Sequence, residues 1–131
     1  MKGNQKVIDA FNTLLANELA AIDQYFIHSR MYDDWGLDKL YVRLNHEMEE
    51  EKDHADWLIK RILFLEGVPN MTKRRDLLIG NDVKSMMQND LTLELEVVAC
   101  VKEVIAICEE QQDYQSREVL EKLLFDTEED H

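Results

Sequence analysis

Four segments of the chain repeat apolar residues every three or four positions, and in each segment an acidic residue interrupts the repeat. This spacing is typical of amphipathic helices that bury one face. The predicted helices span residues 5–34, 38–65, 82–110 and 113–131. A carboxylate on a buried helix face is strongly unfavourable unless a positive partner lies beside it. Four such helices are therefore constrained to gather their acidic residues around cations.

The polar residues on the predicted inner faces form a repeated pattern. They are Glu18 in the first helix, Glu47, Glu51 and His54 in the second, Asp90 and Glu94 in the third, and Glu128 in the fourth, which ends at His131. Glu51 and Glu128 each begin a Glu-x-x-His step, which ends at His54 and His131. Residues three apart share a helix face. Each step therefore offers a carboxylate and an imidazole to one ion. Two matching halves, each a helix with Glu followed by a helix with Glu-x-x-His, predict a centre for two divalent ions.

The breaks between the helices predict how they connect. The segment EGVPNMTKRRDLLIGND, residues 66–82, contains the only proline and is long enough to run the length of a bundle. Helices two and three can therefore be parallel, which is the pattern of a four-helix bundle with one long crossover. Asp38 and either Asn81 or Asp82 are candidate N-caps. We expect an all-α fold and a single domain over residues 1–131.

Charge and cysteine content narrow the function. The chain carries 28 acidic and 15 basic residues, a net charge of −13, which counts against nucleic acid as a partner. It has neither a long apolar run nor the apolar core of a signal peptide, so we expect a cytoplasmic protein without a membrane partner. Cys100 and Cys108 share one face of a helix about 12 Å apart. We therefore expect two buried, reduced thiols, not a disulfide.

Together these residues resemble a known family. The stretches NELAAIDQYFIHSRMYDDWG, HADWLIKRILFLEGVPN, LIGNDV, DLTLELE and DYQSREVL, with the final EEDH, are similar to the ferritin-like di-iron carboxylate proteins and, within them, to the bacterioferritin family. The resemblance covers the whole chain. It implies a ferritin-like up-down-down-up four-helix bundle with a long crossover between helices two and three. Because the family's fourth helix continues past the histidine and a short fifth helix follows, the resemblance also implies a last helix cut short and a truncated product.

The resemblance assigns roles to particular residues. The implied ferroxidase ligands are Glu18, Glu51, His54, Glu94, Glu128 and His131. Glu51 and Glu128 would bridge the two ions, and Tyr25 would lie beside the centre as a further catalytic residue. His46 and Glu50 match an inner-surface iron site, although an aspartate is more usual at the second position.

The implied function is iron storage and detoxification. Two Fe(II) ions per subunit would be oxidised by O₂ or H₂O₂, and the product would be deposited as mineral inside a 24-meric cage. The position of the family's haem-binding methionine is Lys52, and Met48 lies one turn away. This departure is similar to the haem-poor subunit type of two-subunit bacterioferritins. We therefore expect no haem b ligand from this chain, and the partner could be a second bacterioferritin subunit as well as other copies of the same chain.

Other interpretations stay open on the sequence. The chain could be a structural, poorly catalytic subunit of a mixed cage, which Lys52 and the abrupt end at His131 favour. It could also be a free-standing di-iron oxidase of the rubrerythrin kind, although no Cys-x-x-Cys module is present. A mini-ferritin is disfavoured because its metal site forms between subunits. We expect His28 to be an ordinary polar residue, and Trp35 and Trp57 to have packing or subunit-contact roles.

Overall fold

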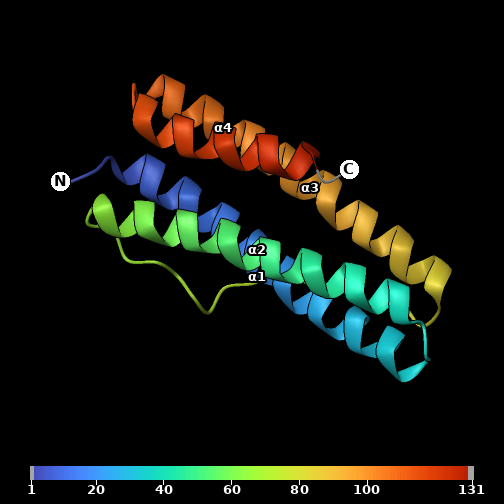
Figure 1. The fold of residues 1–131 in the computed structure, drawn as a ribbon. Helices are drawn as coiled ribbons and strands as arrows, with labels where there is room; N and C mark the ends of the chain where they lie inside the picture. The colour runs from blue at the N-terminus through green and yellow to red at the C-terminus, as the bar shows by residue number, and fades with distance from the viewer. Residues whose placement is uncertain (1, 130–131) are drawn as a thin grey trace.

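A computed structural model describes residues 2–129 of the chain and confirms the all-α bundle. The helices are α1 (Gln5–Asp34), α2 (Asp38–Phe64), α3 (Val83–Glu110) and α4 (Tyr114–Glu129). Figure 1 shows α1 and α2 antiparallel, α3 parallel to α2, and α4 returning along α3. The segment between α2 and α3 runs along the outside of the bundle, so the topology is the expected up-down-down-up with one long crossover.

Capping residues explain most helix boundaries. Asn4 caps α1, where its side-chain oxygen accepts hydrogen bonds from the backbone N–H groups of the first turn. Asp82 caps α3 in a capping box with Ser85, one of the two caps predicted for this helix. The predicted cap Asp38 is wrong: the N-cap of α2 is Leu37, which makes no side-chain capping bond. Asp38 instead lies in the first turn, where its negative charge interacts favourably with the helix N-terminus.

A sharp turn reverses the chain between α3 and α4. Gln112 adopts a left-handed backbone conformation with φ of 58°. The carboxylate of Asp113 then accepts the Ser116 N–H at 3.0 Å and the Ser116 hydroxyl at 2.6 Å. The described part of α4, 16 residues, lies along part of α3 (Figure 1).

Each helix packs against two others. α1 contacts α2 and α3, and α4 packs against α3 and α2. Phe11, Leu14, Leu58, Leu93 and Leu120 are fully buried and join the four helices into one core. The free thiols Cys100 and Cys108 are buried, as expected. No helix among the described residues combines the length and apolar character that a membrane span requires.

The crossover segment is held against α1 by polar side chains. The bonds join Asn12 to the Val68 carbonyl (3.0 Å) and the Asn70 N–H (2.8 Å), Asp23 to Arg74 (3.0 Å), Gln24 to the Leu78 N–H (2.8 Å) and His28 to the Gly80 N–H (3.2 Å). A second attachment, between Arg75 and Glu96, reaches α3. The segment has no regular secondary structure, yet it is fixed along its length.

Candidate metal centre

Three of the predicted ligands come together in the middle of the bundle. Glu18 projects from α1, and Glu51 and His54 project from successive turns of α2. One ligand atom of each lies within 4.8 Å of the others. Their exposed fractions are 0% for Glu18, 8% for Glu51 and 1% for His54. The interruptions in the apolar repeats therefore do mark one buried group of metal-ligating atoms.

Glu18 is the most unusual member of this group. Its two carboxylate oxygens are buried, and neither has a hydrogen-bond donor in suitable geometry among residues 2–129. His54 Nδ1 lies 3.3 Å from Oε2 of Glu18, but this contact is an ion pair and not an aligned hydrogen bond. Buried polar atoms are nearly always satisfied in folded proteins. An orphaned carboxylate of this kind fits a site that receives a cation.

His54 connects three carboxylates. Its Nδ1 lies 3.4 Å from Oε2 of Glu51, and its Nε2 lies 2.6 Å from Oδ2 of Asp126 on α4. Burial lowers the pKa of His54, but the close contacts with the carboxylates of Glu18 and Glu51 and their negative charges outweigh it and raise the pKa to about 11. The imidazole is therefore protonated in the metal-free protein, and its positive charge offsets part of the acidic charge around it.

The pKa of the second buried carboxyl group is also shifted. Burial, followed by the negative charge of the adjacent Glu18, raises the pKa of Glu51 well above its ordinary value. Two carboxylates this close cannot both ionise easily without a cation. The raised pKa values of His54 and Glu51 both favour proton binding at the site when no metal is bound.

This set of donors suits a divalent first-row ion. Carboxylate oxygens and an imidazole nitrogen are the ligands that iron, manganese and zinc accept in proteins. An arriving metal would displace any proton held by His54 or Glu51, because ligands bind metal in their deprotonated form. The residues present therefore fit a metal ion, with Glu18 as the donor that most lacks a partner.

A groove of about 390 Å³ lies at the surface beside the buried ring of Tyr25, and Glu18, Glu51 and His54 are not part of its lining. Its lining comes from three helices: Tyr25 and Tyr32 of α1, Leu40, Arg43, Leu44 and Glu47 of α2, and Met87, Asp90, Leu91 and Glu94 of α3. Burial and then the nearby charges of Glu94 and Glu51 raise the pKa of Tyr25 well above its ordinary value. Glu94, a predicted ligand, thus lies in this half-buried groove next to Tyr25.

The structure does not bring Glu128 into the group. Glu128 is exposed in the last turn of α4, and Thr127 is buried instead. Its predicted inward position is wrong for the described helix, because Leu123, not Leu124, takes the central position in the core. A one-residue difference in the inner stripe rotates a helix face by about 100°. His131 lies outside the described residues, so the ligand roles of both residues stay predictions.

His46, of the other predicted iron site, and Lys52, at the haem-ligand position, are exposed on α2. His46 Nε2 lies 2.8 Å from Oε1 of Glu50, and the imidazole is largely exposed. Lys52 is exposed and pairs with Glu49 at 3.3 Å. Met48 is buried in the core, so its sulfur packs among apolar side chains.

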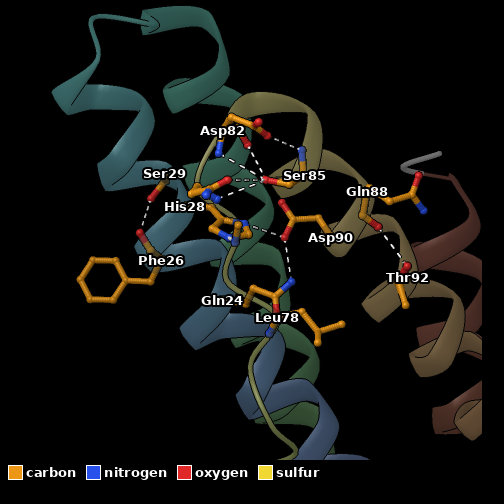
Figure 2. Close-up of polar contacts among 12 residues, drawn as sticks. Gln24, Phe26, His28, Ser29, Leu78, Asp82, Ser85, Gln88, Asp90 and Thr92 are labelled. Carbon is orange, nitrogen blue, oxygen red and sulfur yellow. Dashed lines mark hydrogen bonds and ion pairs between the residues drawn. The ribbon is translucent and has the colours of Figure 1, made fainter.

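Sequence reasoning missed two polar contacts around the site. Asp126 contacts His54 from the face of α4 turned toward α2. The apolar repeat of the sequence does not indicate this position. His28, taken as an ordinary polar residue, is fully buried and its Nδ1 lies 2.8 Å from Oδ1 of Asp90. The same oxygen accepts from Gln24 at 2.9 Å. Figure 2 shows this cluster beside the crossover. Asp90 does face inward as predicted, but its described bonds join it to α1.

Comparison with known proteins also supports the resemblance to ferritins. A family model described as "Ferritin-like domain" matches residues 8–131. The chain is 56% identical to a bacterial ferritin of Synechocystis sp. and 57% identical to one of Pseudomonas aeruginosa, in each case over all of the chain and 84% of the relative. It is 43% identical to a bacterioferritin of Brucella melitensis over 98% of the chain and 80% of that protein. The chain therefore belongs to the ferritin family.

Proposed function

We propose that the protein stores and detoxifies iron by oxidising Fe(II) to Fe(III) at a centre inside its own helical bundle. The observation that carries this proposal is the fully buried Glu18 carboxylate, which lacks a hydrogen-bond donor and lies within reach of Glu51 and His54. The names of the ferritin relatives support iron as the metal. We also propose that residues 1–131 act as one domain, since a single family model matches nearly all of them.

The proposed centre takes two Fe(II) ions per subunit as substrate. Glu18, Glu51 and His54 are its preformed part, and Glu94, Glu128 and His131 complete the ligand set. Glu94 lies in the groove that ends at Tyr25, so it can be reached by an ion that enters there. Glu128 is exposed, and its role requires the last turn of α4 to rotate by about 100° toward the centre.

The residues suit this oxidation for a chemical reason. Each Fe(II) gives up one electron, so two ions together reduce O₂ and two protons to H₂O₂, or H₂O₂ and two protons to two water molecules. Carboxylates are hard oxygen ligands that stabilise the extra charge of Fe(III). His54 and Glu51 bind metal in their deprotonated forms, so metal binding favours loss of any proton that they hold. Tyr25 stays protonated beside the centre because burial and the acidic groove raise the pKa of its hydroxyl group.

The proposals on location, assembly, the inner-surface iron site and haem follow from the resemblance to bacterioferritin and from the relatives. We propose a cytoplasmic protein that self-associates into a 24-meric cage, alone or with a second bacterioferritin subunit. His46 and Glu50 would guide oxidised iron at the inner surface. Haem b is not proposed for this chain, because Lys52 occupies the ligand position and Met48 is buried.

An anaerobic Fe(II) titration followed by an air pulse tests the proposal. We expect two irons per chain and a rapid Fe(III) absorbance rise in the near ultraviolet. Glu51→Ala and Glu94→Ala should lose this rise, whereas Glu103→Ala, on an exposed part of α3, should keep it. Unchanged oxidation in the first two variants would overturn the proposal.

A structural subunit of a mixed cage is the second candidate. Two observations favour it. Glu128 is exposed, and the carboxylate of Asp126 contacts Nε2 of His54. Weak binding with slow oxidation in the same titration, together with co-purification of a second bacterioferritin chain, would select this candidate. Full oxidation by the chain alone would exclude it.

A further inference from the structure

A groove of about 330 Å³ lies on the outside of α2 and α4, away from the one beside Tyr25. Its lining combines two aromatic rings, one aliphatic side chain and three cationic side chains. They are Trp57, Phe64 and Val119, and Lys60, Arg61 and Lys122. Neither the ligand set nor the proposed oxidation uses this groove.

The rings form one apolar surface along α2. Trp57 and Phe64 are seven residues apart, so they lie on the same face two turns from each other. The guanidinium of Arg61 stacks 4.7 Å from the Phe64 ring centre, and the ammonium of Lys122 lies 4.4 Å from the Trp57 ring centre. Each ring therefore has a cation over one face, and both rings line the groove.

The positive charge of the groove is unusual for this protein. The chain has a net charge of −13, yet three basic residues and no acidic residue line this surface. Arg61 binds Ser116 at 2.8 Å and Asp113 at 3.5 Å, and Lys60 pairs with Asp56 at 2.9 Å. Lys122 has no carboxylate partner within residues 2–129 and instead lies over Trp57. It is the cation most available to an arriving anion.

We propose that this groove binds a small amphipathic anion, namely an aromatic or short acyl body that carries one carboxylate or phosphate group. The apolar body would lie against Trp57, Phe64 and Val119, and the anionic group would pair with Lys122 and Lys60. A neutral apolar molecule leaves Lys122 without a partner, and a cation is repelled by all three basic residues. Charge complementarity therefore selects the anion.

One lining residue of the groove lies beside the metal centre. The ring of Trp57 lies 5.3 Å from the ring of His54, centre to centre, at an interplanar angle of 45°. An occupant in contact with Trp57 is thus one side chain away from a ligand of the centre. Binding in the groove and metal binding at His54 would then influence each other by the same factor in both directions.

Fluorescence of the full chain tests the proposal with 8-anilinonaphthalene-1-sulfonate as the probe. The chain has two tryptophans, so a Trp35→Phe background leaves Trp57 as the only energy donor. We expect saturable energy transfer from Trp57 to one bound probe. Lys122→Gln should weaken binding about fivefold, since it removes one charge pair near the surface. Lys102→Gln, on an exposed part of α3, is the matched control and should not change it.

Competition and a neutral probe complete the experiment. Displacement of the probe by 2-naphthoate, by 1-naphthyl phosphate or by both supports the site and identifies the preferred anionic group. Failure of both to displace it would overturn the proposal. So would equal binding of the uncharged N-phenyl-1-naphthylamine, or a change in oligomeric state in Lys122→Gln, which would show that a second copy of the chain covers the groove.

Discussion

His54 Nε2 lies 2.6 Å from Oδ2 of Asp126, and this contact is the polar connection between the buried carboxylates of α1 and α2 and the last helix. The imidazole reaches Glu18 and Glu51 through its other nitrogen. α4 therefore contributes to the centre in the metal-free protein through Asp126, although sequence periodicity pointed to Glu128. The first prediction follows from this contact.

Replacement of Asp126 by alanine should destabilise the metal-free protein. The change removes the acceptor of a buried, protonated imidazole nitrogen. Because Asp126 is about half exposed, water screens part of the interaction, and we expect a loss of about 1 kcal/mol in unfolding free energy. Urea unfolding with a chelator, followed by circular dichroism, measures it. Glu118→Ala, in an exposed position on the same helix, is the control, and an equal effect in both variants would contradict the prediction.

Divalent metal should stabilise the protein through Glu18. At a free Zn²⁺ or Co²⁺ concentration 100-fold above the dissociation constant, one site adds about 2.7 kcal/mol to the unfolding free energy. Glu18→Gln keeps the shape of the side chain but removes its charge, so most of this gain should disappear. Glu103→Gln should retain it. The comparison requires thermal unfolding with and without metal, and an undiminished gain in Glu18→Gln would show that the metal binds elsewhere.

Gly80 should not tolerate a side chain. A Cβ atom there would lie 2.7 Å from the backbone nitrogen of Met86 and 2.6 Å from Oγ of Ser85, the residue that closes the capping box of α3. Gly80→Ala should therefore cost about 1–3 kcal/mol. Gly36→Ala has no atom within 4 Å, and its cost should come only from the positive φ of 73°. Amide hydrogen exchange at the start of α3 checks this explanation. Equal protection of those amides in Gly80→Ala and Gly36→Ala would contradict it.

Alkaline pH should weaken the fold through the buried thiols. Burial, and then the charge of Asp113, raises the pKa of Cys108 to about 11, whereas an unfolded chain ionises a thiol near pH 9. Between these values the unfolded chain has lost a proton that the folded protein still holds, so stability falls as the pH rises. Cys108→Ala should show a shallower decline, by up to about 1.4 kcal/mol per pH unit. Urea unfolding at several pH values from 8 to 11 measures it, and parallel curves would refute the assignment.

Much of the centre could be predicted because α1 and α2 are strongly patterned. Glu18 is a single charge within an otherwise apolar stripe that includes Leu14 and Leu15, so its inward direction was unambiguous. Glu51 and His54 continue the stripe of α2 between Leu44 and Leu58 in the same way. The crossover could be predicted from its length and its proline. These features depend on local spacing, which a sequence contains directly.

The remaining features depend on contacts between distant residues. Leu123 and Leu124 are adjacent and equally apolar, so the sequence allowed two orientations of α4 that differ by about 100°. Packing against α3 and α2 decides between them and turns Glu128 outward. The pairing of His28 with Asp90 spans 62 positions and joins α1 to α3 beside the crossover (Figure 2). No periodic pattern specifies such a pair, because each partner alone looks like an ordinary polar residue.

The attachment of the crossover to α1 has a consequence for how the two halves of the bundle align during folding. A slide of α3 by one turn would preserve much of its apolar contact, but it would move Glu94 by about 5.4 Å along the bundle. The same slide would separate Asp90 from His28 and pull the crossover from Gln24, leaving their buried hydrogen bonds unmade. Misaligned bundles are therefore less stable even without a bound ion. The crossover thus helps to select the register in which the inner ligands face one another.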